Sequence, residues 1–416
     1  KYAHIATVHV LNNVNVDALD LMMTATDGSS DRGDDDDASA ATWNVKFKRD
    51  DSSDVSSHKF ASTKNLQVEE LLCDRLVIAS GGLSVINKDG TGLQLLAKMG
   101  HRIIPLYPAL TPLLSHGNVR SLHKELSGLS SQRVKLSAVC LRSDADASTE
   151  EHYQSEKGEL IHRLIDANPF LFTHRGYSGP AALNISHHTI LGGSRLEPIV
   201  AAVPPSTSDN HEQSGTMAKL SLDISESDSI SQFMFRPSSI APDDNQSSNR
   251  NVKSLFIEVN WTPDISYQDW DSLFTAAHRK GSKQQVRNFV HRNSNNNNFL
   301  PQRLMNLLFD SGQEQSLGDK LVCQLTREER QTIINRIVRY RIPISGNEGL
   351  KKAEVTGGGV DLRDIDPDTL RSNVQPNLFL CGEALDAFGC IGGFNFAFAW
   401  ITGKITGQSS VKSFWM

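Results

Sequence analysis

The sequence predicts an α/β fold in which two α/β segments flank a β-rich block and a helical block. One observation is the apolar run Leu76 to Ala79, which closes on Gly81 and Gly82. A second short apolar run, Leu378 to Cys381, lies near the end of the chain. Unbroken apolar runs of this length, bounded by glycines, are typical of strands buried on both faces of a parallel sheet.

The first α/β segment contains two further strands and a helix. Residues 9–21 and 43–47 alternate between apolar and polar side chains, which predicts two strands. Leu93 to Met99 is rich in leucine and alanine and follows Gly90-Thr91-Gly92, so we expect a helix there. Gly100 stands where a left-handed residue commonly ends a helix.

From about Thr111 the pattern becomes that of a β-rich block. The segments interpreted as its strands are 134–141, 158–164, 181–185, 220–224 and 255–259. A glycine-punctuated turn at 171–180 precedes the third of them.

A helical block follows the β-rich one. Ser266 can cap a helix over 267–278, and leucines at helical spacing predict another over 299–309. Thr326 and Glu329 form a capping box in front of an apolar stripe.

The residues after Gly393 permit two interpretations. Phe394, Phe396, Phe398 and Trp400 alternate, which is a strand signal, whereas Ala399, Gly403 and Gly407 recur every four residues. The second pattern gives a helix one small face for close packing on a sheet, and we favour the helix.

Composition narrows the functional classes. The 416 residues carry a formal net charge of −6 and 22% charged side chains, which fits a soluble globular protein and disfavours a nucleic-acid partner. The five cysteines include no C-x-x-C pair, so neither a disulfide framework nor a metal site is expected, and an intracellular location, in the cytoplasm or an organelle, is favoured. No apolar run is long enough to predict a membrane span. Four polar low-complexity segments are expected to be surface loops: 27–41, 206–215, 237–251 and 293–298.

Chemistry-bearing residues gather after the last apolar run. Gly382 and Glu383 follow it directly, and an acidic residue at the carboxyl end of a parallel strand can accept hydrogen bonds from sugar-like hydroxyls. Gly392 and Gly393 allow a backbone to approach a ligand, and a helix starting there would favour an electron-rich group. The alternative is a structural strand, turn and helix without a ligand.

Four segments in order carry a resemblance to a known family. They are 76–84, 90–110 with Gly90-Thr91-Gly92 and Pro108-Ala109-Leu110, 172–180 with Phe172-Thr173-His174 and Ser178-Gly179-Pro180, and 352–360 leading into Gly382-Glu383. Together with 378–400 they resemble BaiN-type, or aminoacetone-oxidase-like, FAD-dependent oxidoreductases, whose FAD domain is glutathione-reductase-like.

The resemblance implies a Rossmann-like FAD-binding domain formed by residues 1–112 and 348–416. It also implies that residues 113–347 are an inserted domain, β-barrel-like and β-rich over 113–260 and helical over 261–347. FAD is the implied cofactor, with NAD(P)H as a candidate electron donor. A hydride would pass between flavin N5 and a nicotinamide or small organic substrate, whose identity the sequence does not give.

The resemblance also implies roles for single residues. Glu383, after Gly382, would bind the ribityl or pyrophosphate part of FAD, and Gly392, Gly393, Phe394 and Asn395 would face the flavin pyrimidine edge. Gly81 and Gly82 would lie near the adenosine side. Asp386 would either line this site or cap a turn.

Two departures from the family pattern accompany the match. The family begins with a strand and a G-x-G-x-x-G helix, and this sequence contains no such motif, so we expect an N-terminally truncated FAD domain whose targeting signal is not visible. Ala397 stands where the family commonly has glutamine.

Two function classes follow from these observations. The first is an FAD-dependent oxidoreductase acting on a small molecule, and the alternative is a non-catalytic remnant of the fold that serves as a binding or scaffold protein. A nucleic-acid-modifying flavoprotein is disfavoured by the acidic charge. His174 is a candidate acid or base, although a turn histidine more often satisfies backbone groups, and a redox pairing of Cys381 with Cys390 is disfavoured by its spacing. Oligomeric state is not predicted.

Overall fold

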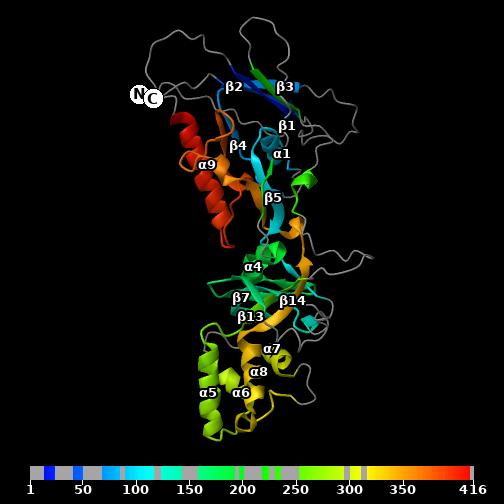
Figure 1. Cartoon of the computed structure of the whole chain (residues 1–416), viewed down its shortest axis with the longest axis vertical. Helices are drawn as coiled ribbons and strands as arrows, with labels where there is room; N and C mark the ends of the chain where they lie inside the picture. Colours follow the sequence, from blue (N-terminus) through cyan, green and yellow to red (C-terminus); the bar gives the residue numbers. More distant parts are fainter. Residues whose placement is uncertain are drawn as a thin grey trace, which may run out of the picture.

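The computed structural model describes residues 14–23, 41–49, 68–84, 90–116, 123–142, 158–192, 196–200, 218–223, 230–235, 253–294, 300–310 and 316–412. The predicted surface loops fall outside these ranges except for Ala41, Asn293 and Ser294. The molecule is elongated, with a four-stranded sheet at one end and a group of helices at the other (Figure 1). The expected domain boundaries are not tested by this arrangement and stay a prediction.

The sheet at one end is antiparallel in the order β12-β1-β2-β3. Its strands are β1 (Val14–Met23), β2 (Ala41–Arg49), β3 (Val68–Cys73) and β12 (Ala218–Asp223). The predicted strands at 9–21 and 43–47 are confirmed over the described residues. The strand predicted at 220–224 exists, but its expected place in the middle block is wrong, because β12 pairs with β1. Alternation predicts a strand but not its partner.

The α/β part is built around a short parallel pair. Its strands are β4 (Leu76–Ile78) and β16 (Leu378–Leu380), with β5 (Arg102–Ala109), β11 (Ile199–Val200) and β15 (Val355–Val360) forming a neighbouring three-stranded sheet. Its helices are α1 (Thr91–Lys98) and α9 (Phe394–Lys412), and the 3-10 turn η6 (Gly382–Ala384) lies between β16 and α9. Leu76 lies opposite Leu378 in parallel register, so both predicted strands are confirmed. Burial on both faces is confirmed for β16 but wrong for β4, whose Val77 is 42% exposed. The segment after Gly393 is a helix, as favoured.

The middle of the molecule is a seven-stranded sheet in the order β13-β14-β6-β10-β9-β7-β8. Its strands are β6 (Leu113–Ser115), β7 (Ser130–Arg142), β8 (Glu159–Arg163), β9 (Asn168–Phe172), β10 (Gly176–Ser178), β13 (Lys253–Asn260) and β14 (Tyr340–Asn347). β13 also pairs with β7, so the pairings from β13 through β14, β6, β10 and β9 to β7 close into a ring.

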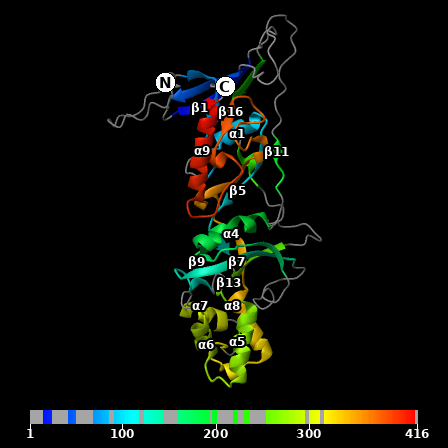
Figure 2. The same ribbon diagram turned by 90° about the vertical axis from the view of Figure 1, so that its left-hand side faces the viewer.

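The strand predicted at 181–185 is wrong, because these residues begin α4 (Gly179–Leu191). Pro180 occupies the first turn, where its missing N–H costs nothing, and alanine and leucine are good helix formers. Ala181, Ala182 and Ile185 are fully buried in the core of the middle sheet. α4 lies between this sheet and the α/β part (Figure 2).

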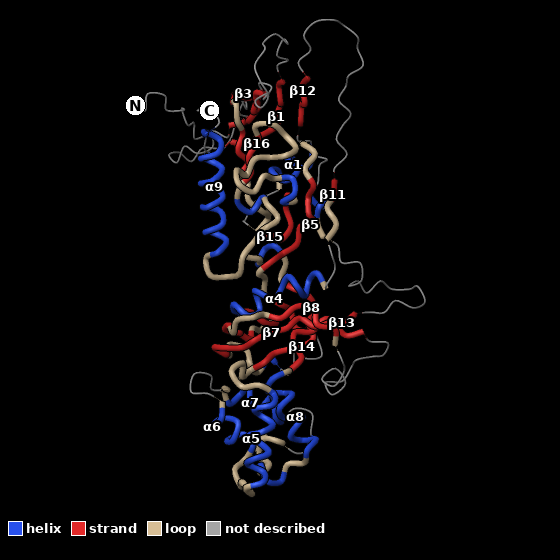
Figure 3. The backbone as a smooth tube through the Cα atoms, turned by 60° about the vertical axis from the view of Figure 1, so that its left-hand side comes forward, coloured by secondary structure: helices blue, strands red, loops and turns tan. Residues whose placement is uncertain are grey.

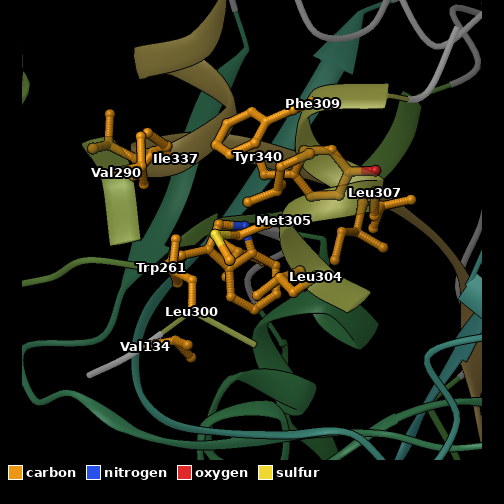
Figure 4. Close-up of a cluster of buried hydrophobic side chains, with 14 of the residues drawn as sticks. Val134, Trp261, Val290, Leu300, Leu304, Met305, Leu307, Phe309, Ile337 and Tyr340 are labelled. Carbon is orange, nitrogen blue, oxygen red and sulfur yellow. The ribbon is translucent and has the colours of Figure 1, made fainter. Parts of the chain in front are cut away.

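Helices form the far end of the molecule, as Figure 3 shows. They are α5 (Tyr267–Arg279), α6 (Val286–Asn293), α7 (Gln302–Asp310) and α8 (Arg327–Val338). Capping boxes start α5 at Ser266 and α8 at Thr326, as predicted. Their apolar faces share one core with the middle sheet, in which Trp261 and Tyr340 meet leucines of α7 (Figure 4).

Candidate functional site

The carboxyl ends of β4 and β16 meet at Gly82 and Glu383. A Cβ atom added to Gly82 would lie 2.2 Å from Glu383 Oε1 and 2.5 Å from Thr356 Oγ1. Parallel pairing of the two strands brings their ends to the same edge, where open α/β sheets place ligands. Only glycine fits at position 82 without moving the carboxylate, so the structure joins these two predicted site residues.

One oxygen of the Glu383 carboxylate is held by the protein itself. Oε1 accepts hydrogen bonds from the Thr356 N–H at 2.7 Å and from Ser84 Oγ at 3.0 Å. Thr356 Oγ1 in turn accepts from the Leu83 N–H at 2.7 Å. Within the described part of the chain no donor contacts Oε2, so this oxygen can accept from a ligand hydroxyl. Gly82, Ser84, Thr356 and Glu383 are called the carboxylate cradle below.

Ser84 and Thr356 were not predicted as site residues. Both belong to segments that carry the family resemblance. The Ser84 N–H donates to Thr356 Oγ1 at 3.1 Å, and this contact joins residues 272 positions apart. The signal that could have found Thr356 is its place before three successive glycines, which permit close approach of other backbone segments.

The first turn of α9 forms the second part of the site. Gly392 and Gly393 have φ angles of 122° and 93°, a region that favours glycine. A Cβ at Gly393 would meet nothing within 4 Å, so this end of the helix is open. The first N–H groups of a helix lack intrahelical acceptors and carry its positive dipole end. The turn can therefore receive an electron-rich group, and Phe394 beside it is 62% exposed.

Asn395 braces this turn from within. Its Oδ1 accepts from the Gly389 N–H at 2.8 Å, and its Nδ2 donates to the Gly389 carbonyl at 3.2 Å. Asn184 of α4 accepts from the Ile391 N–H at 2.8 Å, which ties the same loop to the middle of the molecule. The Asn395 amide is thus occupied by the loop, and a direct contact with a cofactor stays a prediction.

Gly81 and Gly382 shape the two strand ends. Their φ angles are 71° and 67°, so both backbones turn in the left-handed region. The Gly382 N–H donates to Thr402 Oγ1 of α9 at 3.0 Å, which fixes η6 against that helix. These two glycines shape the strand ends that carry the carboxylate cradle.

Asp386 lies beside the glycine run of β15. Its N–H donates to the Val360 carbonyl at 2.9 Å. Burial, and then the charge of Asp361, raise the pKa of the Asp386 carboxyl, against a smaller opposite effect of the Gly358 N–H. Burial next to Asp386 also raises the pKa of Tyr107 to about 12. A half-buried carboxyl and a buried phenol, both with raised pKa values, therefore lie together beside β15. Tyr107 was not predicted.

The remaining candidates take no part in the carboxylate cradle. His174 is on the turn between β9 and β10, with Nδ1 3.0 Å from Ser127 Oγ, and not in the carboxylate cradle. Burial raises the pKa of the Cys381 thiol, whereas Cys390 is exposed, and both are free thiols. Among the described residues, no group of three or more His, Cys, Asp or Glu is placed to hold a metal ion. In the same part of the chain, no helix has the length and apolar character to cross a bilayer.

The sequence of the chain is similar to those of several named proteins. The chain is 25% identical over 375 residues to a ribosomal RNA dihydrouridine synthase of Escherichia coli, an alignment that covers 89% of the chain and 69% of that protein. A protein of the same name from Haemophilus influenzae is 26% identical over 332 residues, or 79% of the chain and 58% of that protein. A 3-dehydro-bile acid delta(4,6)-reductase of Clostridium scindens is 33% identical over 89 residues, or 21% of the chain and 22% of that protein.

The family model described as HI0933-like protein Rossmann domain matches residues 38–409. The matched range contains the parallel strand pair, the carboxylate cradle and nearly all of α9. The mixed α/β architecture fits this assignment and supports a flavoprotein of the oxidoreductase kind. The chain therefore belongs to the HI0933-like Rossmann-domain family, within the BaiN-type FAD-dependent oxidoreductases that its sequence resembles.

Proposed function

We propose that this chain is an FAD-dependent reductase that saturates a carbon–carbon double bond next to a carbonyl group. The names of the relatives support this reaction class. One relative is named a dihydrouridine synthase and another a delta(4,6)-reductase, and both names denote saturation of a carbon–carbon double bond. The chain spans 69% and 58% of the length of the two synthases. We propose the same reaction class for this chain.

The carboxylate cradle is the observation that carries the proposal. The atoms around Gly82 leave no room for a side chain, and Glu383 keeps Oε2 available while Oε1 is fixed by Thr356 and Ser84. These features fit the hydroxyl-rich ribityl and ribose parts of FAD, which need acceptors and a close backbone. The open first turn of α9 fits the electron-rich pyrimidine edge of the flavin. Gly82, Glu383, Gly392 and Gly393 would therefore hold the cofactor.

FAD supplies the two-electron chemistry when it is bound, and NAD(P)H is the electron donor that we propose. The chain must also provide a proton for the second carbon of the double bond. The carboxyl of Asp386 holds a proton to higher pH than usual because it is buried near Asp361. With Tyr107 beside it, we propose Asp386 as the group that holds and delivers this proton.

We further propose that residues 113–347 form a domain inserted into the FAD-binding domain. The two flanking segments share the β4–β16 pair, although most of the chain lies between them. Asn184 of α4 reaches the loop at Ile391, so the inserted part supports the start of α9. In this arrangement the inserted domain shapes the substrate side of the site.

The test begins with FAD binding. The purified chain, and the chain extended by any upstream codons of its gene, are titrated with FAD and followed by the quenching of flavin fluorescence. We expect Glu383→Ala and Gly393→Val to weaken binding by roughly 10-fold or more, because each removes a contact or blocks the approach. Gly403→Ala is the matched control, since a Cβ there would meet nothing within 4 Å.

Reductase activity is then measured with NADPH and 2-cyclohexenone, under exclusion of oxygen. Asp386→Asn should retain FAD binding but lower the rate of enone reduction. FAD binding without any reduction would favour the alternative, a non-catalytic scaffold. Absence of FAD binding in both forms of the chain would refute the cofactor assignment.

A further inference from the structure

The charge of the chain is unevenly distributed. Residues 272–309 contain no aspartate or glutamate, although the whole chain has a net charge of −6. The same stretch carries six lysines and arginines: Arg279, Lys280, Lys283, Arg287, Arg292 and Arg303. The acidic excess that disfavours nucleic acid for the chain as a whole therefore lies elsewhere.

The structure places this acid-free stretch in the helices at the far end of the molecule. It covers most of α5, the turn after it, α6 and most of α7. These helices lie opposite the four-stranded sheet that contains β1 (Figures 1 and 2). Trp270 and Phe274 of α5 and Val290 of α6 are fully buried in the shared core. The polar faces of both helices are consequently held in fixed positions at the surface.

Four of these six side chains form no ion pair with the residues that the structure describes. Arg287 is 13% exposed and pairs with Asp310 at 3.1 Å and Asp319 at 3.6 Å. Arg303 is bound to a backbone carbonyl at 3.0 Å. The other four are exposed and form no ion pair with any residue that the structure describes: Arg279, Lys280, Lys283 and Arg292. Three of them lie at the end of α5 and in the turn after it, and Arg292 lies in the last turn of α6. We call these four residues the basic surface.

Nearby acidic groups do not neutralise the basic surface. Asp271 of α5 pairs with Arg330 at 2.9 Å. Glu329 of α8 pairs with Lys320 at 2.6 Å. Asp319 contacts Arg287, as above. These three acids thus face other cations. Asp269 and Glu328 lie in the first turns of α5 and α8, and Asp269 is held by the capping box at Ser266.

We propose that the basic surface binds the phosphate backbone of a structured RNA. The four cations can contact phosphates, and the amides of the neighbouring Gln284 and Asn288 add hydrogen-bonding groups. A lipid surface fits less well, because membrane-binding helices expose a large apolar face. On α5 and α6 the only exposed large apolar side chain among the described residues is Leu273, at 36%.

RNA binding at the basic surface would add a substrate class to the proposed reductase. This step rests on the proposed function, which supplies the chemical group that is reduced. The two synthases that match most of the chain are named for ribosomal RNA. An RNA anchored at the basic surface would present a uracil base, whose ring contains a double bond next to a carbonyl group. RNA would then be the carrier of the substrate, and the carboxylate cradle would serve the cofactor.

The dependence of RNA affinity on salt concentration can be predicted from the number of phosphate contacts. Four phosphate contacts predict that log K falls with log salt concentration with a slope of about −3.6, or ~100-fold between about 50 mM and about 200 mM salt. Reversing two of the four charges should reduce the slope by about 2 and weaken binding by ~10-fold or more.

The experiment measures fluorescence anisotropy of a labelled RNA hairpin of ribosomal sequence with the purified full chain. K280E/K283E is compared with K351E/K352E, which changes two exposed lysines of a short turn outside the acid-free stretch by the same charge. We expect a large loss for the first pair and less than about a 2-fold change for the second. Circular dichroism checks that both variants are folded.

Three outcomes would overturn the proposal that the basic surface binds RNA. They are an equal loss of affinity in the two double variants, no RNA binding by the unaltered chain, and tighter binding to phosphatidylserine vesicles than to RNA. Reduction of 2-cyclohexenone is measured on the same samples. Enone reduction without RNA binding would refute the surface and leave the reductase proposal intact. RNA binding that depends on Lys280 and Lys283, without any reduction, would support the surface and count against the reductase.

Discussion

Replacing Gly82 with alanine tests the packing of the carboxylate cradle. The φ angle of Gly82 lies outside the left-handed region, so alanine adds no backbone strain and the effect is steric. The new Cβ would lie 2.2 Å from Glu383 Oε1, which forces the carboxylate away from Thr356 and Ser84. Two hydrogen bonds to a charged acceptor are then lost. With about 1.5 kcal/mol for each in a partly buried site, the free energy of unfolding should fall by about 3 kcal/mol.

The assay is urea-induced unfolding followed by tryptophan fluorescence. Gly403→Ala serves as the control and should raise the free energy of unfolding by up to about 1 kcal/mol, as expected for a glycine replaced within a helix. Gly82→Ala combined with Glu383→Ala should cost less than the sum of the single changes by about 1 kcal/mol or more, because the two side chains compete for one space. Unaltered stability of Gly82→Ala, or additive effects, would refute the reasoning.

Two further predictions concern histidines and cysteines. Burial, and then the neighbouring histidines, lower the pKa of His187 to about 3 and that of His188 to about 4. The unfolded chain binds these protons with an ordinary pKa of about 6.5, so the free energy of unfolding should be highest above that pH and fall toward about pH 4, by up to about 1.4 kcal/mol per pH unit for each histidine. Urea midpoints across this window measure the slope, which His188→Gln should flatten; an equal slope in both proteins would contradict the assignment. Cys390 should react with iodoacetamide in the folded protein, whereas Cys381 and Cys140 should react only after unfolding. Mass spectrometry detects the labelled residues. Labelling of Cys381 before unfolding would show that its strand is not buried.

Local patterns in the sequence predicted much of the fold. The apolar runs at Leu76 and Leu378 and the capping boxes at Ser266 and Thr326 are properties of a few adjacent residues, and the structure confirms them. Partners far along the chain could not be predicted in the same way. Nothing local to residues 220–224 indicates pairing with β1, and the short apolar segment at 181–185 suits a strand or a helix equally.

The candidate site shows the same division. Glycines and an acid after a buried strand predicted Gly82 and Glu383, which the structure brings together. Thr356 escaped prediction because its role arises from a contact between distant segments. Asn395 was predicted to face a cofactor, but its amide bonds both backbone groups of Gly389, a partner that depends on the path of the loop. Side-chain amides have several possible partners, and only the folded loop selects one.

The contact between Ser84 and Glu383 joins residues 299 positions apart, and this separation sets the order in which the molecule can assemble. Closing a flexible loop of that length costs about 5 kcal/mol of chain entropy, which prior folding of the intervening residues reduces. During synthesis the middle sheet and the four helices leave the ribosome before β16 exists, so they can fold first and draw the chain ends together. The carboxylate cradle then forms after these parts, and a cofactor that binds there would recognise only chains in which β16 and α9 have been made and folded.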